Sequence, residues 1–212
     1  MSLCIYLPLL LKGTVVTIGA WIASGILSLI VGTFLGIISC RSLTSPRWSM
    51  LIRSYTFIAK GVPAYVQILI AYFVIPAMLG INIPGFAAAT GALAFCSSGY
   101  VAEIVRAGIN TISPGQWDAC FVLGYPLRAT VFRIILPQTF KNVLPALIGE
   151  LEQLLKSTSL LATIGITELT RTGMNIISRE LNPIPMYLLI AGIYLLFSAV
   201  LQLIIIYSEK RS

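Results

Sequence analysis

The side chains that could bind a polar solute lie together in one otherwise apolar segment, residues 144–163. The polar and ionisable residues of this segment are Glu150, Glu152, Gln153, Lys156, Ser157, Thr158 and Ser159. At about 100° per residue, Glu150, Gln153 and Ser157 share one face of a helix. Glu152, Lys156 and Ser159 share the opposite face. Because ionisable groups are costly in lipid, both faces are expected to meet a bundle interior or a watery path.

The candidate solute path therefore comprises Glu150, Glu152, Gln153, Lys156, Ser157 and Thr158. Glu152 and Lys156 are four residues apart and can pair, which lowers the cost of burying each charge. Such a pair can serve either as structural support or as part of the path. Glu150 has no opposite charge one turn away, so it is the better candidate for meeting an ammonium group or a cationic side chain. Glu103 and Arg106, three residues apart, are expected to form a local ion pair.

The sequence also excludes several kinds of chemistry. It contains no histidine, which removes histidine-based acid–base catalysis and most zinc sites. No G-x-x-x-x-G-K-[ST] phosphate loop occurs, so the chain cannot cradle ATP by itself. Its four cysteines are too far apart for a metal-ligand spacing. We therefore expect no catalytic residue, metal or cofactor in this chain.

The composition is that of a membrane protein. Hydrophobic residues make up 58% of the chain and charged residues 10%, whereas a soluble domain carries about a quarter charged residues. About 20 apolar residues cross a bilayer as a helix, and five such spans are expected at about residues 14–39, 55–79, 86–105, 144–163 and 186–207. Residues 1–212 are thus expected to form a single all-α transmembrane domain.

Small residues recur at every fourth position in the first span. They are Ser24, Ser28, Gly32 and Gly36. A row of small side chains lets another helix approach closely, and we favour packing within the bundle over dimerisation of subunits.

The basic residues predict the orientation of the spans. The net charge of +7 lies mainly at the ends of apolar runs, which reflects membrane topology rather than nucleic-acid binding. One side would hold Arg41, Arg47, Arg53, Arg106, Arg128, Arg133, Lys141, Lys210 and Arg211, and the other only Lys12, Arg171 and Arg179. Because the basic excess stays cytoplasmic, the N-terminus is predicted outside and the C-terminus inside.

A charged insert at residues 113–137 separates the third and fourth spans. Ser113 and Gln116 fit a capping box, and Gly124 fits a helix end, so a helix of about ten residues is predicted at 114–123. Trp117, Phe121 and Tyr125 recur at four-residue intervals and form an aromatic stripe. Such a stripe suits docking in a groove of a partner, or lying among lipid headgroups.

The same insert carries a longer pattern. Asp118, Ala119, Gly124, Ile134, Leu136 and Pro137 match E-A-A, three residues, G, nine residues, I-x-L-P, with Asp118 replacing Glu and Cys120 replacing the second Ala. The insert thereby resembles the cytoplasmic EAA loop of binding-protein-dependent ABC importers. Other fragments resemble polar amino acid permeases. These are Gly61, Val62 and Pro63; Tyr100, Ala102, Glu103, Arg106 and Gly108; Gly115, Gln116 and Trp117; and Lys156, Thr158, Ser159 and Leu160.

The resemblance implies a five-helix permease bundle of the type I ABC importers, with a short cytoplasmic coupling helix, in the bacterial inner membrane. The ATPase-coupling role carries over onto Gly115, Gln116, Trp117, Asp118, Ala119, Gly124 and Pro137. A separate ATPase dimer would bind ATP and Mg. A second permease subunit, identical or related, would complete the path for a polar amino acid, and an extracytoplasmic binding protein would deliver it.

The alternative is an ATP-independent channel or secondary carrier for a small polar solute. In that case the charges of residues 144–163 would form an ion relay. A membrane scaffold without a substrate is disfavoured by the polarity of that segment.

Overall fold

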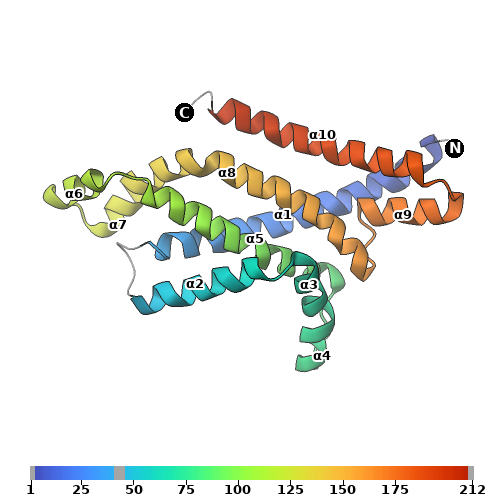
Figure 1. Cartoon of the computed structure of the whole chain (residues 1–212), viewed down its shortest axis with the longest axis horizontal. Helices are drawn as coiled ribbons and strands as arrows, with labels where there is room; N and C mark the ends of the chain where they lie inside the picture. Colours follow the sequence, from blue (N-terminus) through green and yellow to red (C-terminus); the bar gives the residue numbers. More distant parts are fainter. Residues whose placement is uncertain (1–2, 41–45, 210–212) are drawn as a thin grey trace.

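The protein is a bundle of helices whose longest members lie side by side. The computed structural model describes residues 3–40 and 46–209, and all regular structure within those ranges is helical. The helices that run along the long axis of the molecule include α1 (Leu3–Ile38), α5 (Gly85–Asn110), α8 (Leu136–Ser157) and α10 (Pro183–Glu209) (Figure 1). The predicted all-α class is confirmed.

The close approach of α1 to α5 holds the bundle together. Gly32 and Gly36 of α1 lie against Val101 and Val105 of α5. A Cβ atom added at Gly32 would lie 2.5 Å from the Val101 Cβ atom, so only glycine fits there. Both valines are fully buried. The predicted role of the small residues in packing within the bundle is therefore confirmed at these two glycines.

The second apolar run is broken rather than continuous. Its helices are α2 (Pro46–Gly61), α3 (Ala64–Leu69), a π-helical turn (Ile70–Val74) and α4 (Ile75–Leu79). The axis bends by 98° between α2 and α3, and α3 and α4 run across the long axis of the bundle rather than along it (Figure 1). Pro63 explains the break, because proline lacks an N–H group and disfavours a helical residue before it. The predicted span at 55–79 is thus not one straight helix.

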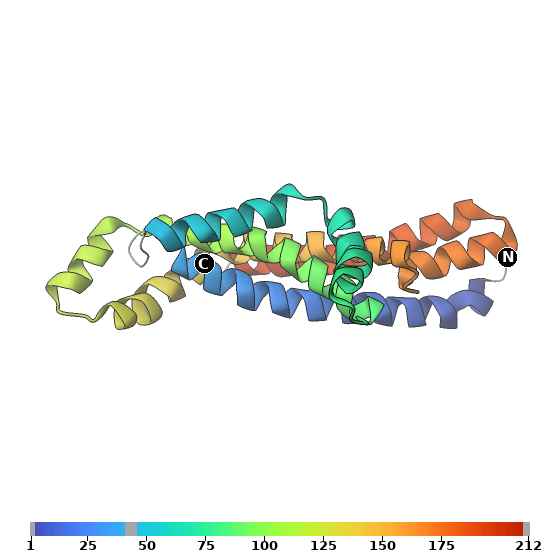
Figure 2. The same ribbon diagram turned by 90° about the horizontal axis from the view of Figure 1, so that it is seen from below.

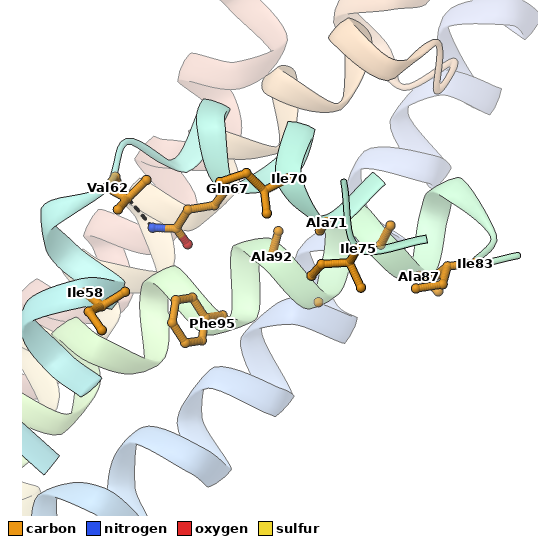
Figure 3. Close-up of a pocket in the computed structure, with 12 residues that line it drawn as sticks. Ile58, Val62, Gln67, Ile70, Ala71, Ile75, Ile83, Ala87, Ala92 and Phe95 are labelled. Atoms are coloured by element: carbon orange, nitrogen blue, oxygen red, sulfur yellow. Dashed lines mark hydrogen bonds between the residues drawn. The ribbon is translucent and has the colours of Figure 1, made fainter. Parts of the chain in front are cut away.

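Gln67 stabilises the break between α2 and α3. Its Nε2 group donates to the carbonyl oxygen of Ala59 at 2.8 Å and to that of Val62 at 2.7 Å, and Figure 3 shows its side chain directed at Val62. Carbonyl groups freed by a break are costly in lipid unless a side chain pairs with them. Beyond Gln67, residues from α2 to α5 line an open, apolar cavity of about 500 Å³ (Figure 3).

Short elements connect the long helices. α6 (Pro114–Val122), α7 (Leu127–Ala129) and a π-helical turn (Thr130–Ile135) lead from α5 to α8. A 3-10 turn (Thr158–Ile164) and α9 (Leu169–Glu180) lead from α8 to α10. α6 and α7 project from one end of the bundle, whereas α9 lies at the other end (Figure 1 and Figure 2).

Three helical segments of the described chain are long and apolar enough to span a membrane. They are Ile5–Ile38, Gly85–Asn110 and Pro183–Tyr207, and the bent pair Arg47–Gly61 and Ala64–Leu79 would be a fourth. α8 is not among them, since it carries Lys141, Glu150, Glu152 and Lys156. The crossing by α8 stays a prediction.

Three helices begin well before the predicted spans. α1 begins at Leu3 rather than at residue 14, α2 at Pro46 rather than at residue 55, and α8 at Leu136 rather than at residue 144. The first turns of α8 are amphipathic, with Thr139 and Val143 buried and Lys141 exposed. Hydropathy alone therefore misses where this helix begins.

The contact between α1 and α5 predicts the effect of substituting Gly32. In Gly32→Ala, the new methyl group would meet Val101 and the Ser98 carbonyl oxygen, which lies 2.7 Å from the added atom. Overpacking of this kind costs about 1–3 kcal/mol. We expect a lower melting temperature of the purified protein in detergent.

Gly19→Ala is the matched control on the same helix, because no atom lies within 4 Å of a Cβ atom added there. This variant should be neutral or slightly stabilising. Equal melting temperatures for Gly32→Ala and Gly19→Ala would contradict the packing described above.

Candidate functional site

A polar cavity lies between the break in α2 and the middle of α5 and α8. Its volume is about 350 Å³. The polar side chains that line it are Lys60 from α2, Cys96, Ser97 and Tyr100 from α5, and Glu150, Gln153 and Ser157 from α8. The face of α8 predicted from the helical period therefore meets a cavity rather than lipid.

Glu150 is the acidic side chain that lines this cavity. It is half-buried, and its Oε1 atom accepts a hydrogen bond from the Ser97 hydroxyl at 2.7 Å. Within the described chain, its carboxylate makes no ion pair with a lysine or arginine. A partly desolvated carboxylate with one hydrogen bond and no cation attracts an ammonium group.

The positive charge beside the cavity is already paired. Lys60 forms an ion pair with Glu103, and its Nζ atom lies 5.6 Å from the centroid of the Tyr100 ring. The predicted pair of Glu103 with Arg106 is wrong, because α2 packs beside α5 and brings Lys60 to Glu103 instead. With Lys60 paired, Glu150 is left as the uncompensated charge of the cavity.

The remaining members of the predicted path lie elsewhere. Glu152 and Lys156 form the expected ion pair, with a distance of 2.7 Å between the Lys156 Nζ and Glu152 Oε1 atoms. Neither lines the cavity. Thr158 is buried, and its hydroxyl donates to the Leu155 carbonyl oxygen at 2.6 Å. The structure thus gathers Glu150, Gln153 and Ser157 and separates the other three.

Sequence reasoning missed several residues of the cavity. Lys60, Cys96 and Ser97 carry no local signal, since they reach the cavity only after α2 and α5 pack against α8. Tyr100 belongs to a fragment that resembles amino acid permeases, and this resemblance is the one sequence feature that could have indicated its place in the cavity.

The short helix α6 ends as predicted. Gly124 has a φ of 73°, in the left-handed region that favours glycine. The N–H groups of Tyr125 and Gly124 donate to the carbonyl oxygens of Cys120 and Phe121, both at 3.0 Å. This arrangement is a Schellman motif, which satisfies the last carbonyl groups of the helix.

The start of α6 differs from the prediction. The Ser113 side chain makes no capping hydrogen bond, so the capping box is wrong. Gln116 accepts a hydrogen bond from Gln138 Nε2 at 2.8 Å instead. This contact joins the start of α6 to the start of α8. Gln138, which is distant in sequence, is therefore the partner of Gln116 in place of Ser113.

The predicted aromatic stripe is divided between two faces of α6. Trp117 packs against the core and Cys120 is buried, so this face holds α6 on the bundle. Phe121, Val122 and Leu123 are 85%, 83% and 73% exposed. Of the predicted coupling residues, Trp117 is partly buried, and the exposed ones are Gly115, Gln116, Asp118, Ala119, Gly124 and Pro137. An apolar tip therefore projects from the end of the molecule (Figure 2).

The chain matches known proteins over most of its length. It is 37% identical over 165 residues to the arginine transport system permease protein ArtQ of Bacillus subtilis, covering 78% of this chain and 74% of that protein. It is 31% identical over 205 residues to the L-cystine transport system permease protein TcyB of the same organism, covering 96% and 86%.

A solved structure agrees in fold along the whole chain. It is a crystal structure of an amino acid ABC transporter with histidines, and it matches with a TM-score of 0.90 and 32% identity over 100% of this chain and 97% of that chain. These similarities favour the importer over an ATP-independent channel or carrier.

Residues 28–212 match the family described as binding-protein-dependent transport system inner membrane component. Because that match takes in most of the chain, and because the fold agrees from end to end, the protein belongs to the family of inner-membrane components of binding-protein-dependent transport systems.

Proposed function

We propose that this protein is the permease subunit of an ATP-driven importer for a polar amino acid in the bacterial inner membrane. The observation that carries the proposal is its similarity to permeases of arginine and cystine transport systems and to an amino acid ABC transporter. The cavity beside Glu150 supplies suitable chemistry, since every amino acid carries an ammonium group that a carboxylate can pair with.

The substrate path is proposed to pass through this cavity. Glu150 would bind the ammonium group, while Gln153, Ser157 and Tyr100 offer hydrogen-bonding groups around it. Lys60 is paired with Glu103, so it does not cancel the charge of Glu150. Glu152 and Lys156 are assigned a structural role, because they pair with each other outside the cavity.

The coupling surface is proposed to be the tip of α6. Its exposed apolar residues Phe121, Val122 and Leu123 suit insertion into a groove of a separate ATPase, in the manner of a helix docked in a groove. That partner would bind ATP and Mg, since this sequence has no phosphate loop. Closure of the ATPase dimer would move α6 and switch the side from which the cavity is reached.

The assembly and orientation follow the same proposal. Two permease subunits, identical or related, would surround the path, and an extracytoplasmic binding protein would deliver the amino acid. α6 and the end of α10 lie at one end of the bundle, and the start of α1 lies at the other (Figure 1). This placement supports an outer N-terminus and an inner C-terminus. Of the basic residues that predicted it, Arg41, Lys210 and Arg211 lie outside the described residues.

Substitution of Glu150 tests the substrate path. Glu150→Gln removes the charge but keeps a carbonyl oxygen that can accept from Ser97. A hydrogen bond to a charged group contributes about 1.5–3 kcal/mol, so we expect amino acid uptake to lose roughly tenfold to a hundredfold in apparent affinity. Uptake would be measured in proteoliposomes with the ATPase, the binding protein and ATP.

Glu152→Gln is the control, because it removes a carboxylate of the same helix that does not line the cavity. Its apparent affinity should remain near that of the unsubstituted protein. If the two variants behave alike, Glu150 has no special role in the path.

Substitution of Gly124 tests the coupling surface. A β-branched residue is strained at a φ of 73°, so Gly124→Val should distort the Schellman motif at the tip of α6. We expect uptake to fall while ATP hydrolysis by the partner no longer depends on substrate. Both rates would be measured in the same proteoliposomes.

Gly192→Val, on α10, is the matched control, because no atom lies within 4 Å of a Cβ atom added there. It should import and hydrolyse normally. Normal import and normal hydrolysis by Gly124→Val would show that the end of α6 does not couple the two reactions.

A further inference from the structure

A second cavity, lined by apolar, polar and basic side chains, lies between α1 and α9, at the end of the bundle opposite α6. Its volume is about 290 Å³. The residues that line it are Leu9, Lys12, Gly13 and Val16 from α1, Thr172, Asn175, Ile176 and Arg179 from α9, and Thr167 before α9. On each helix these positions follow the i, i+3, i+4, i+7 spacing of a single face. The cavity is therefore a groove between two facing helices, and we call it the α1–α9 groove.

The fold fixes both ends of the α1–α9 groove. At one end, the Leu169 N–H group donates to the Thr17 hydroxyl oxygen at 3.1 Å. At the other end, the Tyr6 hydroxyl group donates to the Glu180 carboxylate. Between them, Gly13 lets the helices approach so closely that an added Cβ atom would lie 2.6 Å from the Thr172 hydroxyl oxygen. The groove is thus formed before any ligand binds.

The α1–α9 groove is positively charged. Lys12 and Arg179 line it, and neither forms an ion pair within the described chain. Two acidic groups lie nearby but do not line the groove. Glu180 accepts from Tyr6, and Glu168 caps α9 through the N–H groups of Thr170 and Arg171, both at 2.7 Å.

The Glu168 carboxyl group does not line the α1–α9 groove. Its side chain is fully buried and is absent from the lining. Burial raises the pKa of the Glu168 carboxyl group above its ordinary value, against the opposing effect of the hydrogen bonds from Thr170 and Arg171. The charged side chains that line the groove are therefore Lys12 and Arg179.

The surroundings of Lys12 suit a membrane–water interface. Leu11 and Val15 of the same helix are 56% and 69% exposed, and the apolar segment Ile5–Ile38 contains all three residues. Tyr6 and Tyr187 lie near this end of α1 and α10, and tyrosine is enriched at the headgroup level of a bilayer. Apolar side chains of Leu9, Val16 and Ile176 also line the α1–α9 groove.

We propose that the α1–α9 groove binds the phosphate headgroup of an anionic phospholipid, in the membrane leaflet farther from α6. Lys12 and Arg179 pair with the phosphate, and the amide of Asn175 and the hydroxyl of Thr172 offer hydrogen bonds to a polar headgroup. The apolar residues of the groove contact the first part of the lipid chains. An acidic surface of another protein is disfavoured, because the site is concave and apolar side chains of α1 border it.

The test measures lipid binding to the purified full-length protein in detergent. The probes are dioctanoyl phosphatidylglycerol, dioctanoyl phosphatidylcholine and inorganic phosphate. Each basic residue near an anionic headgroup adds to the binding of that headgroup, so K12Q/R179Q should weaken the Kd for phosphatidylglycerol by about tenfold or more. K12R/R179K should retain binding, because both charges remain. R47Q/K141Q removes the same charge from exposed positions on α2 and α8 and should bind as the unsubstituted protein does.

Three results would overturn the proposal. The first is equal affinity for phosphatidylglycerol and phosphatidylcholine. The second is inorganic phosphate binding as tightly as phosphatidylglycerol, which would identify a site for a free anion. The third is unchanged lipid binding by K12Q/R179Q. If that variant keeps its lipid binding but loses binding to the extracytoplasmic binding protein, the groove is a protein contact and the proposal is likewise wrong. Melting curves without lipid show whether each variant is folded. If K12Q/R179Q does not fold, K12R/R179K keeps the test decisive.

Discussion

The contact between α1 and α5 is the constraint on which the other parts of this molecule depend. Two glycines bring the backbone of α1 against Val101 and Val105, and this fixes α5 along the length of the bundle. α5 then presents Ser97, Tyr100 and Glu103 toward α2 and α8. α1 is also held to α8 by the Trp21 indole N–H group, which donates to the Leu151 carbonyl oxygen at 2.8 Å. The helix that carries Glu150 is therefore positioned from two sides.

The charged side chains inside this bundle differ in whether they form ion pairs. In a medium of low dielectric constant, opposite charges are expected to pair. Lys60 pairs with Glu103, and Lys156 pairs with Glu152, so these four groups balance one another. Glu150 departs from this pattern, with one hydroxyl group as its partner and an open cavity beside it. An unbalanced charge is stable there only if water or a ligand reaches it, which is what a transport path requires.

Local signals in the sequence were sufficient where the structure itself is decided locally. Gly124 ends α6 because the left-handed conformation belongs to that one residue, and the helical period placed Glu150, Gln153 and Ser157 on one face. Local signals gave wrong predictions where a side chain has its partner far away in the sequence. Glu103 pairs across helices rather than with Arg106, and Gln116 bonds Gln138 rather than closing a capping box. Pro63 marked the break in α2, but the unbroken apolar run around it favoured a single span.

The two helices that line the cavity, α5 and α8, are also the two that flank α6 in the chain. α5 ends at Asn110, just before α6, and α8 begins at Leu136, just after the π-helical turn that follows α7. Gln116 bonds Gln138 at the base of α8, and Trp117 packs into the core cluster that contains Val105 and Ile109 of α5. A force on the tip of α6 is thus applied to α5 and α8 together. Ser97 and Glu150 sit on these two helices and touch across the cavity, so any change in the angle between α5 and α8 must alter that contact. The hydrogen bond from Ser97 to Glu150 therefore connects the cavity to the two helices that carry α6.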